Sequence, residues 1–433
     1  MPGRLNVKAS AGRVYPPDWS LIGYDDTPIS TLIGFDYAVS IKDNWDTSIV
    51  THTERFRDDK VLMYFPKNID TTNIQTADRM FQASDLEYID IDLSSARTAT
   101  AVFTDCSNLR GAVIHGLGNP DAPAGTLNNI ANMFSNCRSL VDVDLNLTEY
   151  STPLSAVNLF TDCWELKEFE YDGTSESIAR IVTLYNAFTN CYKLESLTVK
   201  DDLTEWIGCY AAGSQTNNGC FFDIDIGRTA PNGAQGAFRK AKIAPGSTFL
   251  LRNFSNAQDI FREAVIKGSP AYVTFGPSFP SSPALNCSYA FADATCELNN
   301  VGISIPSISN ANHMFDGFTF STSEGRITTE YFNINSAANL QNMFSNSNVK
   351  TIAGLGQKSI TAATTLSNMF YNSLNLDNNT LDDIMSLLTT ATSYTGTKTL
   401  QAVGFTESDV YPQSRFQNLS NWNAFIADGW SYS

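Results

Sequence analysis

The segment Asn132-Met-Phe-Ser-Asn-Cys-Arg-Ser-Leu, residues 132–140, recurs in variants along most of this chain of 433 residues. Its phenylalanine marks a series of positions: Phe81, Phe103, Phe134, Phe160, Phe188, Phe238, Phe261, Phe291, Phe315, Phe344 and Phe370. One long interval, after Phe188, indicates two turns with one marker lost between Gly208 and Phe222. The mean interval is then about 26 residues, which lies within the range of leucine-rich arrays.

Two columns of the repeat predict burial. The residue before each marker is apolar, and the residue three positions after it is small in all turns but one. That second column contains Cys106, Cys137, Cys163 and Cys191, with Ala or Ser in most later turns. A column that accepts Cys, Ala and Ser selects for volume, so we expect these cysteines to be small buried hydrophobes and not disulfides or ligands.

A short alternating stretch follows the marker in several turns, as in Leu140-x-x-Val143-x-Leu145-x-Leu147. Period-two alternation is typical of a half-buried strand. Each coil is therefore predicted to be one helical turn around the marker followed by one strand. The predicted fold class is an α/β repeat, a right-handed leucine-rich-repeat solenoid of about eleven coils, closed by a cap at each end because no coil can bury its apolar face alone.

The ends of the chain differ from the repeat. We predict an extended docking arm over residues 1–19, an amino-terminal cap over 20–72, the repeat array over 73–376 and a helical carboxyl-terminal cap over 377–433. The arm is basic and interrupted by glycine and proline, and its candidate docking residues are Arg4, Lys8, Arg13 and Tyr15. In the carboxyl-terminal cap, helices are predicted near 379–388 and 419–426, with Trp422 and Trp430 covering the last coil.

Charge limits the classes of partner. The formal net charge is −17, from 45 acidic and 28 basic residues, which argues against nucleic acid and anionic membranes. No apolar run is long enough for a membrane span, and residues 1–13 do not have the pattern of a secretory signal. We therefore expect neither nucleic-acid binding nor membrane insertion.

The sequence offers little for catalysis. It has three histidines, no Cys-x-x-Cys and no glycine-rich phosphate loop. We predict a protein that is not an enzyme, without catalytic residues, metal or cofactor.

Acidic residues alternate with apolar ones in the predicted strands. In register they would form two rows on the outer face of the sheet, and the candidate binding face is Tyr88, Asp90, Asp142, Asp144, Glu168 and Glu170. Three interpretations stay open: a solvated outer face, a ledge that recognises glycan or protein, and calcium held between coils by paired carboxylates. A glycosidase pair would need a cleft to raise one carboxyl pKa, which a flat solenoid face does not provide.

The runs at 132–140, 342–352 and 368–373 resemble the BspA-type leucine-rich repeat, over roughly residues 73–376. The tail from Leu381 to Trp430 is similar to carboxyl-terminal caps in phages of gut bacteria. That family occurs in bacterial surface adhesins and in phage virion proteins, so the resemblance implies a binding function.

From this resemblance and the arm, we expect a virion structural protein, such as a tail fibre or surface appendage. Its arm would dock to other virion proteins, which would set any oligomeric state, and its repeat face would bind a host-surface glycan or protein. The alternative is a bacterial cell-surface adhesin.

Overall fold

The structure is a computed structural model, which describes residues 5–6, 44–65, 69–117, 127–147, 154–172, 181–202, 207–227, 234–251, 255–267, 272–275, 285–297, 300–305 and 307–432. The chain divides into two compact units, Met1–Cys220 and Phe221–Ser433. Each unit is described by itself below.

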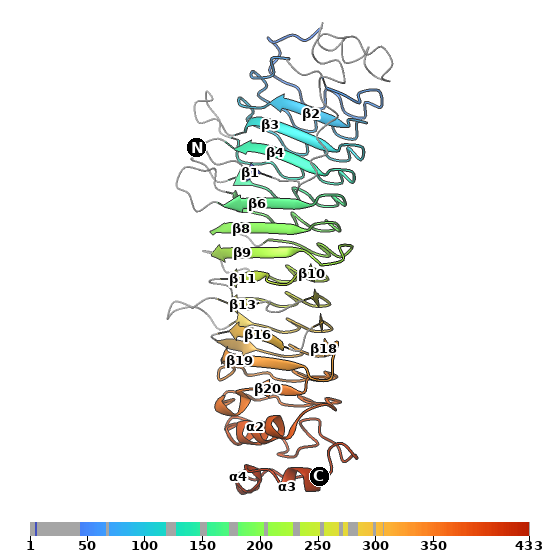
Figure 1. Cartoon of the computed structure of the whole chain (residues 1–433). Coiled ribbons are helices and arrows are strands. Elements are labelled where there is room, and N and C mark those ends of the chain that lie inside the picture. The colour runs from blue at the N-terminus through green and yellow to red at the C-terminus, as the bar shows by residue number, and fades with distance from the viewer. Residues whose placement is uncertain are drawn as a thin grey trace. The chain divides into compact units, whose positions relative to one another are not determined.

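The first unit contains strands β1 to β8. Their bounds are β1 Leu5–Asn6, β2 Tyr88–Asp92, β3 Gly111–Leu117, β4 Asp142–Leu147, β5 Leu154–Ser155, β6 Glu168–Asp172, β7 Ile181–Thr183 and β8 Ser196–Asp202. The main sheet has the order β2-β3-β4-β1-β6-β8, and β5 pairs with β7. All described pairs are parallel except those of β1, which runs antiparallel to both neighbours (Figure 1).

The second unit contains the remaining strands and the helices. The strands are β9 Phe221–Gly227, β10 Lys242–Ile243, β11 Thr248–Leu251, β12 Val265–Ile266, β13 Tyr272–Phe275, β14 Leu285–Asn286, β15 Thr295–Cys296, β16 Asn300–Ile305, β17 Ile308–Asn310, β18 Thr319–Phe320, β19 Arg326–Phe332 and β20 Thr351–Ala353. The helices are the 3-10 turn η1 Leu355–Gln357 and α2 Asn378–Thr389, α3 Gln413–Gln417 and α4 Trp422–Ala427. The main sheet here has the order β9-β11-β13-β16-β19-β20, and β10, β12, β15 and β18 form a second parallel sheet.

The segment around each marker is a pair of tight turns, so the predicted helical turn is wrong. Residues two before and two after the marker adopt left-handed backbone conformations, as at Asn132 (φ 57°) and Asn136 (φ 63°) around Phe134. Asn tolerates this region better than most residues. The repeated Asn-Met-Phe-Ser-Asn motif therefore specifies two left-handed corners, and turn hydrogen bonds such as Cys137 N to Phe134 O (3.1 Å) close each turn.

The marker rings form a stack through the buried core of each unit. In the first unit, Phe134 packs on Phe103 and Phe160 with ring centroids 5.3 and 5.5 Å apart. The backbone N–H of Phe134 donates to Leu159 O of the next turn at 3.0 Å. Each turn is thus joined to its neighbours by stacked rings and a ladder of hydrogen bonds.

The small-residue column behaves as predicted. All eight cysteines are free and buried. In this column, the Cys137 thiol donates to the carbonyl of Phe103 in the preceding turn at 3.0 Å. The column selects a small side chain, and its thiols and hydroxyls also pair with the marker carbonyls.

The turn without a phenylalanine marker lies at residues 208–211. Phe188 N donates to Gly208 O at 2.8 Å, as each marker does to the residue before the next marker. Buried Cys209 therefore occupies the marker position, and Ala211 (φ 58°) is the left-handed residue after it. A Cβ at Gly208 would lie 2.5 Å from Asn186 N, so the close approach of the turns requires glycine there.

The repeat turn begins before the predicted boundary at residue 73. Phe56 stacks on Phe81 at 5.4 Å and is flanked by left-handed Glu54 and Asp58. Its N–H donates to Met80 O at 2.8 Å, in the marker pattern. Residues 20–43 of the predicted amino-terminal cap, and the predicted arm apart from residues 5–6, lie outside the described residues.

The carboxyl-terminal cap contains both predicted helices and a short third one. Helix α2 begins after Asp377, whose carboxylate accepts from Thr380 N at 2.7 Å. Trp430 is buried and stacks between Tyr394 (5.8 Å) and Phe425 (5.6 Å), as expected for a residue that covers the end of the core. Helix α3 was not predicted.

The fold is a parallel β-solenoid of about eight turns with few helices. Eight of the described main-sheet strands have five residues or more: β2, β3, β4, β6, β8, β9, β16 and β19. The prediction of a repeat solenoid is confirmed at this level. The finer prediction of a leucine-rich-repeat solenoid of about eleven coils goes beyond this count. The helical turn predicted for each coil is wrong, because the marker turns are not helical.

Candidate functional site

The predicted acidic rows lie on one side of the main sheet of the first unit. The register pairs Asp90 with Val113 and Val113 with Asp144, and it pairs Glu170 with Thr198. Strand β3 separates Asp90 from Asp144, and β1 places Asn6 between Asp144 and Glu170. The carboxylates of this row therefore share a face but alternate with uncharged residues along it.

Exposure differs among the predicted face residues. Glu170 is exposed, whereas Asp90, Asp142, Asp144 and Glu168 are half-buried. Tyr88 is only 4% exposed, so its place on an accessible binding face was wrong. Its ring lies beside Gly111 on β3, which has no side chain to keep the ring away from the backbone.

Asp90 has a specific partner that the sequence did not indicate. His115 Nε2 lies 2.8 Å from Asp90 Oδ1, and both side chains are partly exposed. The two residues come from neighbouring strands, offset by two positions in register. Part of the predicted acidic strip is therefore a carboxylate–imidazole pair at the surface.

Asp144 differs from Asp90, because its Oδ1 is buried without a hydrogen-bond partner in the described part of the chain. Within that part, no group of three or more His, Cys, Asp or Glu could hold a metal ion. The calcium interpretation thus receives no support from these residues, and the predicted docking residues Arg4, Lys8, Arg13 and Tyr15 lie outside the described residues.

The other two histidines have structural partners. His52 stacks on Trp45 at 4.9 Å and lies 2.8 Å from Arg55 Nη1, and burial lowers its pKa. His313 occupies a left-handed corner (φ 54°), where its Nδ1 lies 2.6 Å from Asp316 Oδ2 and its ring stacks on Tyr289 at 4.6 Å. Both rings are used in packing.

Arg138, Trp164 and Tyr192 form a ladder on the surface that was not predicted from the sequence. The Arg138 guanidinium lies 4.5 Å from the centre of the Trp164 ring, and the rings of Trp164 and Tyr192 are 6.1 Å apart. Trp164 is 38% exposed. We call these three residues the aromatic ladder.

The repeat itself positions the aromatic ladder. Its three members each follow a buried column cysteine, so adjacent turns bring them together on the outside of the corner. Lys193 and Glu165 flank it with an ion pair at 2.7 Å. In the sequence these residues share one feature, because each directly follows a column cysteine, Cys137, Cys163 or Cys191. Only the stacking of turns shows that the three side chains meet.

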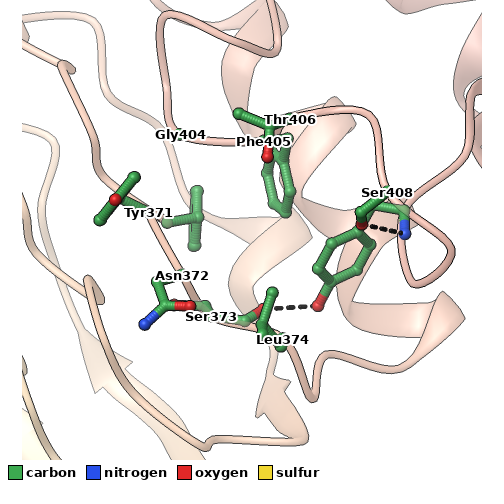
Figure 2. A pocket seen from close by; sticks show the side chains of 10 residues that line it. Tyr371, Asn372, Ser373, Leu374, Gly404, Phe405, Thr406 and Ser408 are labelled. Atoms are coloured by element: carbon green, nitrogen blue, oxygen red, sulfur yellow. Dashed lines mark hydrogen bonds between the residues drawn. The ribbon is translucent and has the colours of Figure 1, made fainter.

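A pocket of about 140 Å³ lies in the second unit. Figure 2 shows the segment from Tyr371 to Leu374 facing the segment that carries Phe405 and Thr406. Its lining residues are Phe370, Tyr371, Asn372, Ser373, Leu374, Gly404, Phe405, Thr406, Ser408 and Tyr411.

The pocket combines exposed apolar side chains with a fixed tyrosine. Tyr371 and Leu374 are about half exposed, at 50% and 54%. The Tyr411 hydroxyl donates to Ser373 O at 2.5 Å and accepts from Leu376 N at 3.0 Å. Burial raises the pKa of Tyr411 to about 12, so it stays protonated in neutral solution.

Comparison of the chain with family profiles, curated proteins and solved structures found no match. Among the described residues, no helix is long and apolar enough to cross a membrane.

Proposed function

We propose that this chain is a non-enzymatic recognition protein that uses the repeat surface of its first unit to bind a glycan or protein on a host cell. The observation that carries the proposal is the aromatic ladder. Trp, Tyr and Arg dominate binding energy at protein interfaces because they combine large apolar area with a polar or charged group. The Trp164 side chain lies on the outside of the repeat, where its ring is not needed to fill the core.

The half-buried and exposed carboxylates of the sheet face supply a second polar surface. Asp90, Asp144 and Glu170 would add charge selectivity for a partner that carries cationic or hydroxyl groups. Side chains of this kind orient a ligand, whereas stacking on an aromatic ring supplies much of the affinity for a sugar or a peptide.

The setting that we propose is a phage virion, as a tail fibre or surface appendage, with a bacterial cell-surface adhesin as the alternative. The support is the resemblance of the repeated motif to BspA-type proteins. The same resemblance supports a leucine-rich classification with about eleven coils, which also stays a proposal. We propose the amino-terminal residues, including Arg4, Lys8, Arg13 and Tyr15, as the attachment to other virion proteins.

The setting is tested by mass spectrometry of purified phage particles and of cell envelopes from the source culture. Stoichiometric recovery of the chain on particles supports a virion component. Recovery on envelopes alone supports the adhesin. Absence of the chain from both particles and envelopes would contradict a role on either surface.

Recognition is tested by binding of the purified full-length chain to host cells. Substitution of Trp164 by Ala should weaken binding by at least about 30-fold, the effect of losing an interface residue worth about 2 kcal/mol. Tyr185→Ala is the matched control, because Tyr185 is also an aromatic residue of the first unit that is 38% exposed, and it lies outside the aromatic ladder. Equal binding by both variants would contradict the role of the ladder.

A further inference from the structure

The pocket of the second unit lies where the hydrogen-bond ladder between its turns ends. In this unit, the left-handed residue two positions after each marker donates its backbone N–H to the next turn. The donors are Lys240, Glu263, Asp293, Gly317 and Asn346, with N···O distances of 2.7 to 2.9 Å. Asn372 follows the marker Phe370 in the same way, but its N–H has no acceptor among the described residues.

The pocket exists because the last marker turn pairs with the next segment for only two bonds. Asn368 N and Phe370 N donate to that segment at 3.1 and 2.9 Å. The chain then turns away at Gly404 (φ 106°), and the ring of Phe405 stacks on Phe370 at 5.5 Å. The third bond, at Asn372, is left open beside the pocket of about 140 Å³ (Figure 2). We call this position the open rung.

A ladder of side-chain amides ends at the same residue. Asn346 Nδ2 donates to Asp316 Oδ1 at 3.0 Å, and Asn372 Nδ2 donates to Asn346 Oδ1 at 3.2 Å. These bonds fix the orientation of the Asn372 amide, and no donor of the described residues reaches its Oδ1. The open rung therefore offers one donor, the backbone N–H, and one acceptor, Oδ1, on a single exposed residue.

Apolar side chains line the pocket beside these two polar groups. Tyr371 and Leu374 keep about half of their surface exposed, and the ring of Phe405 forms part of the lining. An exposed aromatic ring offers a flat apolar area that can stack on the C–H groups of a sugar ring. A few fixed polar groups among apolar ones are typical of a small-molecule site.

The open rung and the size of the pocket narrow the class of ligand. In the preceding turns the acceptor at this rung is an amide carbonyl, so a ligand that completes the rung would bring a carbonyl of its own. A cavity of about 150 Å³ holds one benzene molecule, so this pocket takes one small group and not a row of peptide side chains. An acetamido group has a suitable size and carries a carbonyl, an N–H and a methyl.

We propose that the pocket binds a sugar that carries an acetamido group. The acetamido carbonyl accepts from Asn372 N–H, its N–H donates to Asn372 Oδ1, and its methyl contacts Leu374 and Phe405. The pyranose ring stacks on the exposed ring of Tyr371. This site goes beyond the proposed function, which places recognition on the repeat surface of the first unit, and it depends on no residue of the aromatic ladder.

The pocket is tested by titrating the full-length chain with N-acetylglucosamine and N-acetylgalactosamine, with binding measured by NMR. At least one of the two should bind with a Kd of about 1 mM, as expected for a ligand of this size, and should shift the amide signal of Asn372. Glucose and galactose, which have no acetamido group, should bind at least about 10-fold more weakly. Failure of both acetamido sugars to bind would overturn the proposal.

Substitutions locate the sugar. Tyr371→Ala should weaken binding at least about 10-fold, whereas Phe221→Ala should leave it unchanged, because Phe221 is an aromatic residue of the same unit, 39% exposed, that lies outside the pocket. Asn372→Gly keeps the N–H and the left-handed backbone but removes Oδ1, so it should weaken binding about 5-fold, the loss of one hydrogen bond.

A second variant covers the case in which Tyr371→Ala does not fold. Thr406 is exposed, so Thr406→Phe can place a ring in the pocket without disturbing the core, and it should abolish sugar binding. Equal binding by the pocket variants and Phe221→Ala would overturn the site.

Two further measurements separate this proposal from its alternatives. N-acetylglycine N-methylamide has the amide groups but no sugar ring, and binding as tight as that of the acetamido sugars would mean that the pocket takes a peptide, which would overturn the proposal. Trp164→Ala should bind the sugars normally, whatever its effect on binding to host cells. Loss of sugar binding in Trp164→Ala would place the sugar on the first unit and overturn the pocket.

Discussion

Left-handed residues at the corners of each turn connect the repeated motif to the shape of the backbone. Asn368 is the cleanest example, because it is exposed, has φ 57° and precedes the marker Phe370 by two positions. A β-branched residue is strained in this conformation, which costs about 1–2 kcal/mol, whereas glycine adopts it freely.

We therefore expect Asn368→Val to lower the free energy of unfolding by about 1–2 kcal/mol, measured by urea denaturation. Asn368→Gly should lower it less than Asn368→Val does, because glycine adopts this conformation without strain. Equal losses for the two variants would mean that the side chain, and not the backbone conformation, matters at this corner.

The buried thiols provide a second test at this scale. Burial raises the pKa of Cys106 from its ordinary value of 9.0 to about 11. At pH 8 the thiolate fraction in the folded chain is then about 100-fold lower than in the unfolded chain. Alkylation of Cys106 by iodoacetamide, followed by mass spectrometry, should be at least 100-fold slower in the native protein than in urea.

The same shift predicts how stability depends on pH. The folded chain keeps the Cys106 proton that the unfolded chain loses, so this contribution is complete below about pH 9 and is lost between about pH 9 and pH 11. Cys106→Ala should reduce the fall in the free energy of unfolding over this pH window.

In the alkylation experiment, a native Cys106 that reacts as fast as in the unfolded chain would contradict burial of the small-residue column.

Among the elements, helix α2 depends on a cap that also ties it to the last strand. Asp377 accepts from Thr380 N at 2.7 Å and from Thr351 Oγ1 on β20 at 2.6 Å. Burial acts to raise the pKa of Asp377, but these hydrogen bonds outweigh it and the net pKa is lowered. The stabilisation is present above the ordinary pKa of 3.8 and is lost as the pH falls below it.

Asp377→Ala should therefore destabilise the second unit by about 1–2 kcal/mol at pH 7, and the difference from the unmodified chain should shrink towards pH 3. Thermal unfolding followed by circular dichroism measures both quantities. Asp377→Asn is the control, because an amide oxygen can still accept from Thr380 N. A loss that is independent of pH would show that the ionised carboxylate is not involved.

The elements also show where prediction from the sequence succeeded. The alternation in Leu140-x-x-Val143-x-Leu145 correctly placed β4 and its buried face, since period two is a local property of a strand. The helical turn was wrong, although Asn132 and Asn136 contained the signal for left-handed corners. Apolar residues around a marker fit a turn of either kind, and only the backbone conformation at the flanking positions separates them.

Features that depend on contacts between distant residues were not predictable. Strand β1 has two residues, and its place between β4 and β6 depends on a gap that no local pattern encodes. The aromatic ladder was not predicted, because its members are about one turn apart in the sequence. Cys209 at the marker position is similar, since only the hydrogen bond from Phe188 N identifies it.

For the molecule as a whole, the stacked turns make each unit close to a one-dimensional array, in which a turn contacts mainly its neighbours. In the second unit, Phe344 stacks on Phe315 at 5.2 Å and on Phe370 at 5.6 Å. In such an array, stability is approximately a sum of terms for each turn and for each interface between neighbours. A cavity at one marker should therefore weaken the adjacent turns most.

Phe344→Ala should lower the local free energy of unfolding by about 3–5 kcal/mol, because it removes a fully buried ring between two others. Hydrogen exchange measured by mass spectrometry should then be faster in the turns of Phe315 and Phe370, while β9 and β11 keep their protection. Phe344→Leu, which fills most of the cavity, should show a smaller effect in the same turns. Uniform acceleration through the second unit would instead mean that the unit unfolds as one cooperative block, and that the turns do not contribute separately to stability.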